Sequence, residues 1–161
     1  MLPQSHIIIA THLHKSIKNR FNIELDKRSL IYGSIKPDIP LTLTGLKHFK
    51  PQSFNYICNE IHRLSLLKLM NNKKCISLLS KQIGITTHYV ADYFCIPHND
   101  REKYKNHFLD HLQYEKNLHE LYKFLPENIE ATKTDFNIEN KTSHSIKALL
   151  DKLHYIYTRS E

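Results

Sequence analysis

One short stretch, residues 88–94, carries two ionisable groups inside an otherwise apolar and aromatic run. Their neighbours are Tyr89, Val90, Ala91, Tyr93 and Phe94. A helix that is apolar on nearly every side belongs in the interior of a fold. His88 and Asp92 stand four residues apart in this run, which places both side chains on one helical face. Because a buried carboxylate must be paired or bound to a metal, the stretch predicts a buried helix with one functional polar face.

The rest of the chain repeats apolar residues at helical spacing, with clear breaks between the repeats. Helices are expected over residues 3–18, from Ser53 to a break at 71–72, from that break to 94, from Asn99 or Asp100 to about 122, and from Ser143 onward. Residues 19–50 contain several Gly and Pro breakers and are expected to form a long irregular segment with short helical turns. Residues 126–141 are expected to be an exposed connection. Three glycines and no tryptophan argue against a turn-rich β architecture. The prediction is an all-α protein, a single compact domain over residues 1–161 with about five main helices.

Composition narrows the class of protein further. A chain of 161 residues ordinarily forms one domain, and no apolar run reaches the roughly 18 residues that a transmembrane segment needs. The N-terminus lacks the features of a secretory signal, and Cys58, Cys75 and Cys95 form no CxxC pair. We therefore expect a cytoplasmic protein whose thiols are reduced and serve as small buried apolar side chains. The net charge of +7 favours an anionic partner: a phosphate ester, a lipid headgroup or nucleic acid.

Candidate metal ligands occur in several other segments: His12, Asp38, His48, His98, and the pair His111 and Glu115. His98 follows the point where the chain leaves the buried helix, and His111 and Glu115 repeat the four-residue spacing. Each pair by itself is more often a surface ion pair. Together they offer nitrogen and oxygen donors without clustered thiolates. That set indicates a multi-zinc hydrolytic centre rather than a structural zinc finger.

In their order along the chain, these donors resemble the ligands of the bacterial zinc-dependent phospholipase C family. The matching segments are Thr11-His12, Gly33-Ser-Ile-Lys-Pro-Asp38, His48-Phe49, His88-Tyr-Val-Ala-Asp92, Pro97-His98 and His111-x-x-x-Glu115. The resemblance is strongest over residues 11–115, and the stretch from His88 to His98 is its most specific part. It implies the all-α fold that these phospholipases share with the S1/P1-type nucleases, and a cluster of three zinc ions.

The resemblance also implies a role for each donor. One zinc ion would be held by Asp38, His48, His88 and Asp92. A second would be held by His98, His111 and Glu115. Part of a third site would come from His12, with Asp92 as a bridge, and Asp38 would also stand where the family has a proposed general base. In secreted members the third ion is bound as well by an N-terminal tryptophan. This chain has none, so two or three ions are expected, with the Met1 amino group as the candidate substitute.

The remaining histidines have simpler interpretations. His107 and His119 extend the row of His111 and Glu115 by one turn at each end, but His111 gives the His-x-x-x-Glu pattern of the family and is preferred. His14 points away from His12 on a helix. The others are interpreted as surface histidines or as histidines satisfied by nearby groups: His6, His62, His144 and His154.

Three functions follow as hypotheses. The first is a zinc-dependent phosphodiester hydrolase of phospholipase C type, whose substrate is a phospholipid or another phosphate ester and whose basic surface contacts an anionic membrane. The second is an S1/P1-like nuclease or nucleotidase, which the positive charge suits although no aromatic and basic base-stacking stretch is evident. The third is a metal-binding module without turnover. The sequence leaves the headgroup and the oligomeric state open.

Overall fold

A computed structural model describes residues 1–39, 46–68, 72–99, 107–125 and 142–159. These residues form six α-helices and two short 3-10 helices, and they contain no strand. The prediction of an all-α protein is therefore confirmed. The α-helices are α1 (Pro3–Phe21), α2 (Lys27–Ile35), α3 (Lys50–Ser65), α4 (Lys73–Tyr93), α6 (Phe108–Lys123) and α7 (Ser143–Arg159). The 3-10 helices are η1 (Lys36–Asp38) and η2 (Ile96–His98).

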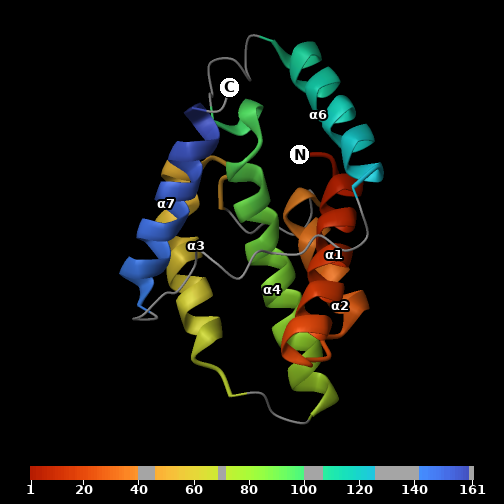
Figure 1. Cartoon of the computed structure of the whole chain (residues 1–161), viewed down its shortest axis with the longest axis vertical. Helices are drawn as coiled ribbons and strands as arrows, with labels where there is room; N and C mark the ends of the chain where they lie inside the picture. Colours follow the sequence, from red (N-terminus) through yellow and green to blue (C-terminus); the bar gives the residue numbers. More distant parts are fainter. Residues whose placement is uncertain (40–45, 69–71, 100–106, 126–141, 160–161) are drawn as a thin grey trace.

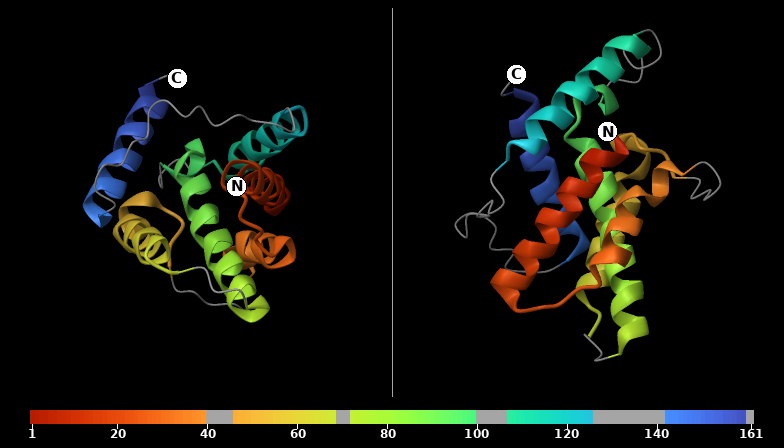
Figure 2. Two further views of the ribbon diagram at one scale, coloured as in Figure 1. Left: turned by 60° about the horizontal axis from the view of Figure 1, so that its bottom comes forward. Right: turned by 90° about the vertical axis from the view of Figure 1, so that its right-hand side faces the viewer.

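Helix α4 runs through the middle of the molecule, with α1 and α2 on one side and α3 and α7 on the other (Figures 1 and 2). The buried apolar residues form two clusters on these two sides. One cluster joins α3, α4 and α7 and is made of Phe54, Ile57, Cys58, Tyr89, Tyr93 and Ile146. The other lies between α1 and α2 and is made of Ala10, Leu25 and Leu30. The two clusters fix α4 from both sides, so its polar residues have a rigid setting.

The α2–α4 crossing brings two helix backbones into direct contact at Gly33 and Gly84. A Cβ atom on Gly84 would lie 2.2 Å from the carbonyl oxygen of Leu30, and one on Gly33 would lie 2.2 Å from that of Lys81. No side chain fits at either position. The expectation that residues 19–50 are irregular is wrong for α2, which begins with Asp26 as its N-cap and contains Gly33 in its interior. The glycine that suggested a break serves the close approach of the two helices.

Other helix boundaries differ from the sequence-based expectation by a few residues. Helix α3 begins at Lys50, and the Ser53 hydroxyl donates a hydrogen bond to the Phe49 carbonyl instead of capping the helix. Asn72 caps α4, since its side chain accepts from the Lys74 N–H. The next helix is expected from the sequence to begin at Asn99 or Asp100. Residues 100–106 lie outside the described residues, as does the predicted connection over 126–141. No described helix has both the length and the apolar character of a transmembrane segment.

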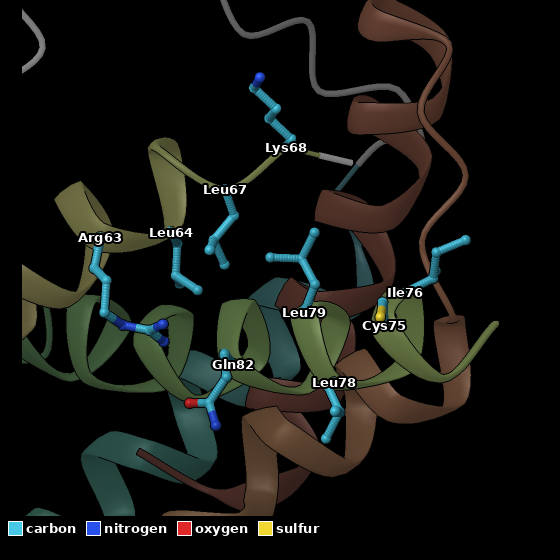
Figure 3. A pocket seen from close by; sticks show the side chains of 9 residues that line it. All are labelled: Arg63, Leu64, Leu67, Lys68, Cys75, Ile76, Leu78, Leu79 and Gln82. Atoms are coloured by element: carbon cyan, nitrogen blue, oxygen red, sulfur yellow. The ribbon is translucent and has the colours of Figure 1, made fainter. Parts of the chain in front are cut away.

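An apolar cavity of about 270 Å³ lies where α3 ends and α4 begins (Figure 3). Its walls are mostly leucine and isoleucine side chains, with Arg63, Lys68 and Gln82 among them. Cys75, which is only half-buried, also lines it. The cavity contains no group of convergent metal donors among the described residues. The chemistry-bearing residues lie at the other end of α4.

Candidate metal centre

The last two turns of α4 form the base of the candidate site. His88 and Asp92 are both 0% exposed, and the His88 Nε2 lies 3.2 Å from the Asp92 Oδ2. The His88 Nδ1 lies 2.8 Å from the carbonyl oxygen of Ser34 on α2, which can only accept a hydrogen bond. The Nδ1 therefore carries a proton, and the Nε2 faces Asp92. Such a backbone contact commonly fixes a metal-binding histidine.

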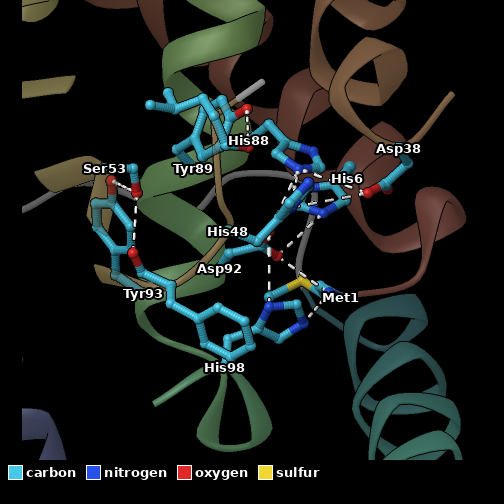
Figure 4. Close-up of polar contacts among 12 residues, drawn as sticks. Met1, His6, Asp38, His48, Ser53, His88, Tyr89, Asp92, Tyr93 and His98 are labelled. Carbon is cyan, nitrogen blue, oxygen red and sulfur yellow. Dashed lines mark hydrogen bonds and ion pairs between the residues drawn. The ribbon is translucent and has the colours of Figure 1, made fainter. Parts of the chain in front are cut away.

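The N-terminus of the chain lies inside this site (Figure 4). The Met1 amino group lies 3.0 Å from the Asp92 Oδ1, 2.9 Å from the Glu115 Oε1 and 2.7 Å from the His98 Nε2. The whole Met1 residue is only 5% exposed. Three groups that the sequence predicts as metal ligands thus surround one amine, which is itself a nitrogen donor when it loses its proton.

His6, one turn into α1, reaches the same site. Its side chain is 1% exposed, and its ring stacks on that of His88 with a centroid distance of 4.0 Å. Its Nε2 lies 3.3 Å from the Asp92 Oδ1, but the geometry is not that of a hydrogen bond. Both ring nitrogens lack a hydrogen-bond partner among the described residues. A buried imidazole in this state is an exception that calls for a cause such as a missing ion.

The segment before α3 and the helix η1 complete this side of the site. The His48 Nδ1 lies 2.8 Å from the Asp92 Oδ2, 3.0 Å from the His88 Nε2 and 3.9 Å from the Asp38 Oδ1. The Tyr89 hydroxyl ties this segment to α4, since it donates to the Leu46 carbonyl at 3.3 Å. The donors of η1 and of residues 46–49 therefore converge on α4 although the segment between them is not described.

The opposite side of the site is built by η2 and α6. The His98 Nε2 lies 3.1 Å from the Glu115 Oε1, and the His111 Nε2 lies 2.5 Å from the same oxygen. His111 and Glu115 are 7% and 5% exposed. The four-residue spacing on α6 therefore turns both side chains inward, as the sequence predicts.

The buried charges of the site hold one another in their ionised forms. Burial alone would raise the pKa of Asp92, but contacts with His48, His6 and His88 and the Met1 charge lower it well below the usual range. Burial likewise opposes ionisation of Glu115, but His98, the amine and His111 lower its pKa to about 2. Burial disfavours the charged amine of Met1, and Asp92 and Glu115 outweigh it and raise its pKa to about 10. Burial lowers the pKa of His6.

The donor set fits a cluster of divalent metal ions. The described residues contain three groups of three donors, and within each group the donor atoms lie within 4.8 Å of one another. The groups are His6, His88 and Asp92; Asp38, His48 and His88; and Cys95, His98 and Glu115. Besides His6, the Asp38 Oδ2 is buried without a hydrogen-bond partner among the described residues. Imidazole nitrogens and carboxylate oxygens are ligands that zinc prefers. Small movements of these side chains would bring the donor atoms to zinc-binding distances.

The structure brings together all the predicted ligands except His12. His12 is half-buried on α1 and joins none of the donor groups in the described part of the chain. His6 and Ala10 share the buried face of α1, whereas His12 follows His6 by six residues and points about 240° around the helix. The sequence analysis interpreted His6 as a surface or satisfied histidine, and that interpretation is wrong. Its four-residue spacing from Ala10, on the apolar face of the helix, is the signal that could have found it.

A pocket of about 380 Å³ opens onto the donors. Asp38, His48, His98, His111 and Glu115 line its inner part, together with Met1. Pro37, Phe49, Phe108 and Leu112 add apolar surface, and Lys47 adds a positive charge. The pocket can therefore admit a ligand that is anionic at one end and apolar at the other.

Comparison with protein families identifies the chain. The family model described as zinc-dependent phospholipase C matches residues 5–161, which includes every predicted ligand and His6. The chain belongs to the zinc-dependent phospholipase C family. Neither a curated protein nor a solved structure matches it. Family membership supports a zinc-dependent hydrolase that acts on phospholipids. Zinc is therefore the metal that we consider for this donor set.

Proposed function

We propose that this member of the zinc-dependent phospholipase C family cleaves the phosphodiester bond of a phospholipid headgroup with a cluster of two or three zinc ions. The observation that carries the proposal is the setting of Asp92. This carboxylate is 0% exposed, and nitrogen donors from α1, α4 and the segment before α3 approach its two oxygens within 3.3 Å. A carboxylate so placed can bridge two cations.

The residues divide among the ions as the resemblance implies, with one change. Asp38, His48, His88 and Asp92 are proposed for the first ion, and His98, His111 and Glu115 for the second. For the third ion we propose His6 in place of His12, together with Asp92 and the Met1 amine. The burial of His6 and the 3.0 Å contact of the amine with Asp92 support this assignment.

Bound zinc supplies Lewis-acid chemistry: it acidifies water and neutralises charge that develops on the phosphate. The protein's own groups supply orientation. Asp38 lines the pocket and has one carboxylate oxygen without a hydrogen-bond partner among the described residues. It can orient a water molecule toward the phosphorus and accept its proton, which is the role of a general base. Ser34 holds the ring of His88 in place through its carbonyl oxygen.

The pocket rim suits a lipid rather than a small hydrophilic ester. Phe108 is 54% exposed at the pocket, and the next residue, Leu109, is 77% exposed. With Lys47 at the same opening and a net charge of +7, the rim can contact acyl chains and an anionic surface. We therefore propose peripheral contact with an anionic membrane during the reaction.

Zinc content measured by elemental analysis, in protein purified without chelators, tests the site. We expect two or three ions per wild-type chain, and fewer than one in Asp92→Asn with the helical circular dichroism retained. His6→Ala should lose one ion, whereas the matched variant His12→Ala should keep the wild-type number. Equal zinc content in His6→Ala and wild type would remove His6 from the site.

Hydrolysis assays test the substrate. We expect the zinc-loaded protein to cleave soluble short-chain phospholipids, and Asp38→Asn to slow cleavage by at least about 100-fold, the usual contribution of a general base. Faster cleavage of single-stranded DNA than of phospholipid would replace the proposal with the nuclease. Stoichiometric zinc without cleavage of any phosphate ester would leave a binding module, and no zinc even after titration would end the metal hypothesis.

A further inference from the structure

Cys95 lies in the tight turn that joins two predicted metal ligands. Its backbone N–H donates to the Asp92 carbonyl at 3.0 Å, and its own carbonyl accepts from the His98 N–H at 2.9 Å. The residue is 0% exposed. Its Sγ, a nitrogen of His98 and an oxygen of Glu115 lie within 4.8 Å of one another. The thiol therefore shares the space of the second proposed ion.

The second buried cysteine provides a contrast. Cys58 is 1% exposed and packs in the apolar cluster with Phe54, Ile57 and Tyr93. Its surroundings are those of a small apolar side chain, as the sequence analysis expects for all three cysteines. Cys95 is equally buried, but its Sγ lies within 4.8 Å of donor atoms of His98 and Glu115, whereas Cys58 joins no donor group among the described residues. Packing alone does not account for a thiol placed among the donors of a metal cluster.

We infer that Cys95 is a thiolate ligand of the zinc ion that His98 and Glu115 hold. This inference rests on the proposed function, because it assumes that the ion binds there. Thiolate sulfur is a preferred zinc ligand, and it binds only after the thiol proton has left. The balanced step is the replacement of the S–H bond by an S–Zn bond, with one proton released to solvent and no change of oxidation state. The resemblance implies nitrogen and oxygen ligands at this ion, so the sulfur is an addition to that set.

A thiolate at this ion has a chemical consequence. It adds a negative charge beside Glu115 and donates more electron density than a carboxylate or an imidazole. The second ion would then be a weaker Lewis acid than it would be with nitrogen and oxygen ligands alone.

Cobalt substitution tests the ligand directly. Chelated protein is reloaded with Co²⁺, and its near-ultraviolet absorption is recorded, because a Co–S bond gives an intense charge-transfer band that nitrogen and oxygen ligands do not give. We expect the band in the wild-type protein, its loss in Cys95→Ser, and its full retention in the matched variant Cys58→Ser at the same cobalt content. Bound cobalt without the band, or a band that survives in Cys95→Ser, overturns the inference and leaves the proposed function standing.

A measurement on the wild-type protein covers the case in which Cys95→Ser does not fold. X-ray absorption at the zinc edge of the zinc-loaded chain detects sulfur directly bound to the metal without any substitution. Sulfur in the first coordination sphere supports the inference, and a sphere of nitrogen and oxygen alone overturns it. If neither cobalt nor zinc binds, the proposed function fails first, and that outcome is distinct from metal bound without sulfur.

Discussion

The α2–α4 crossing and the donor cluster lie one helical turn apart on α4, and they are held together in opposite ways. At the crossing, Gly33 and Gly84 let two backbones touch, with no charge between them. At the cluster, Asp92 is surrounded by an amine and several imidazoles. Packing at the crossing depends on shape alone and is insensitive to pH. The cluster depends on protonation and on metal. The comparison indicates that the packed crossing holds α4 in place and so positions the donors one turn further along the helix.

One hydrogen bond links the two regions. The Ser34 carbonyl, next to Gly33 on α2, accepts from the His88 Nδ1–H at 2.8 Å. The separation of α2 from α4 therefore decides whether the His88 ring is held with its Nε2 toward Asp92. If the crossing widens, the cluster loses this contact even though no donor has been changed. If the side chains of the cluster lose their charges, by contrast, the packing of the α2 and α4 backbones at Gly33 and Gly84 is unchanged.

The largest expected effect follows from Gly84→Ala, which adds a single Cβ at the crossing. In an open helix interior this change stabilises by about 1 kcal/mol through helix propensity. Here the new atom would lie 2.2 Å from the Leu30 carbonyl oxygen, a backbone atom that cannot rotate away. We expect a loss of more than about 3 kcal/mol in the free energy of unfolding, the upper range for an overpacked core. Urea denaturation of the metal-free chain measures it.

The sign of the Gly84→Ala effect decides how close the two helices are. A more stable variant would mean that α2 and α4 are further apart than the contact distances indicate. We also expect zinc content to fall in this variant because the Ser34–His88 contact is displaced. Unchanged zinc binding in a destabilised variant would show that the cluster does not depend on the crossing.

An intermediate effect is expected from acid on the metal-free cluster. The pKa of Glu115 is about 2 in the folded chain and near 4.5 when unfolded. A carboxylate whose pKa is lowered by folding stabilises the fold above the unfolded value and loses that contribution as the pH falls toward the folded value. Between pH 5 and pH 3 we expect Glu115 alone to remove about 2 kcal/mol of stability. Asp92, with its lowered pKa, adds to the loss in the same direction.

The control for the acid effect lies on the same helix. Glu115→Gln should flatten the dependence of stability on pH between 5 and 3. Glu120→Gln, which removes an exposed carboxylate paired with Lys123, should leave this dependence as in the wild type. If stability falls equally with pH in Glu115→Gln and Glu120→Gln, Glu115 is not ionised in the cluster.

Two further groups affect the stability of the metal-free fold at higher pH. His6, whose pKa is lowered by folding, destabilises the fold below about pH 6.5. The Met1 amine, whose pKa is raised by folding, destabilises it as the pH rises through 10.

The sequence predicts the cluster better than the crossing, for a physical reason. His88 with Asp92, and His111 with Glu115, are four-residue pairs whose shared face is a local property of any helix. Gly33 is different, because its role depends on Lys81, which lies far away in the chain. Read locally, a glycine followed by two prolines indicates a break, and the α2 helix was missed for that reason. The all-α class followed from helical periodicity, together with the low glycine content and the lack of tryptophan.

The exchange of His12 for His6 has a similar cause. Both histidines are on α1, and the only local difference between them is that His6 shares a helical face with Ala10. The choice depends on which face of α1 meets α4, and that is fixed by contacts of Ala10 with the cluster of Leu25 and Leu30. Cys95 likewise looks like an ordinary buried cysteine in the sequence, and only its place in the turn after α4 brings it beside His98. Local patterns identify donors, whereas packing decides which of them converge.

The smallest expected effect belongs to Ser80→Ala, one turn before Gly84 on the buried face of α4. The Ser80 hydroxyl donates to the Ile76 carbonyl at 2.7 Å and accepts from the Asp26 N–H at 2.9 Å. The alanine leaves the N–H of Asp26, the N-cap of α2, without its side-chain acceptor. We expect a loss of about 1 kcal/mol, the usual net value of one such hydrogen bond, with no change in zinc content or in the acid dependence. Ser80 lies on the side of α4 that faces the crossing. A Ser80→Ala variant that loses zinc but keeps its stability would contradict the separation of the crossing from the donor cluster. A slightly less stable variant with the wild-type zinc content would support that separation.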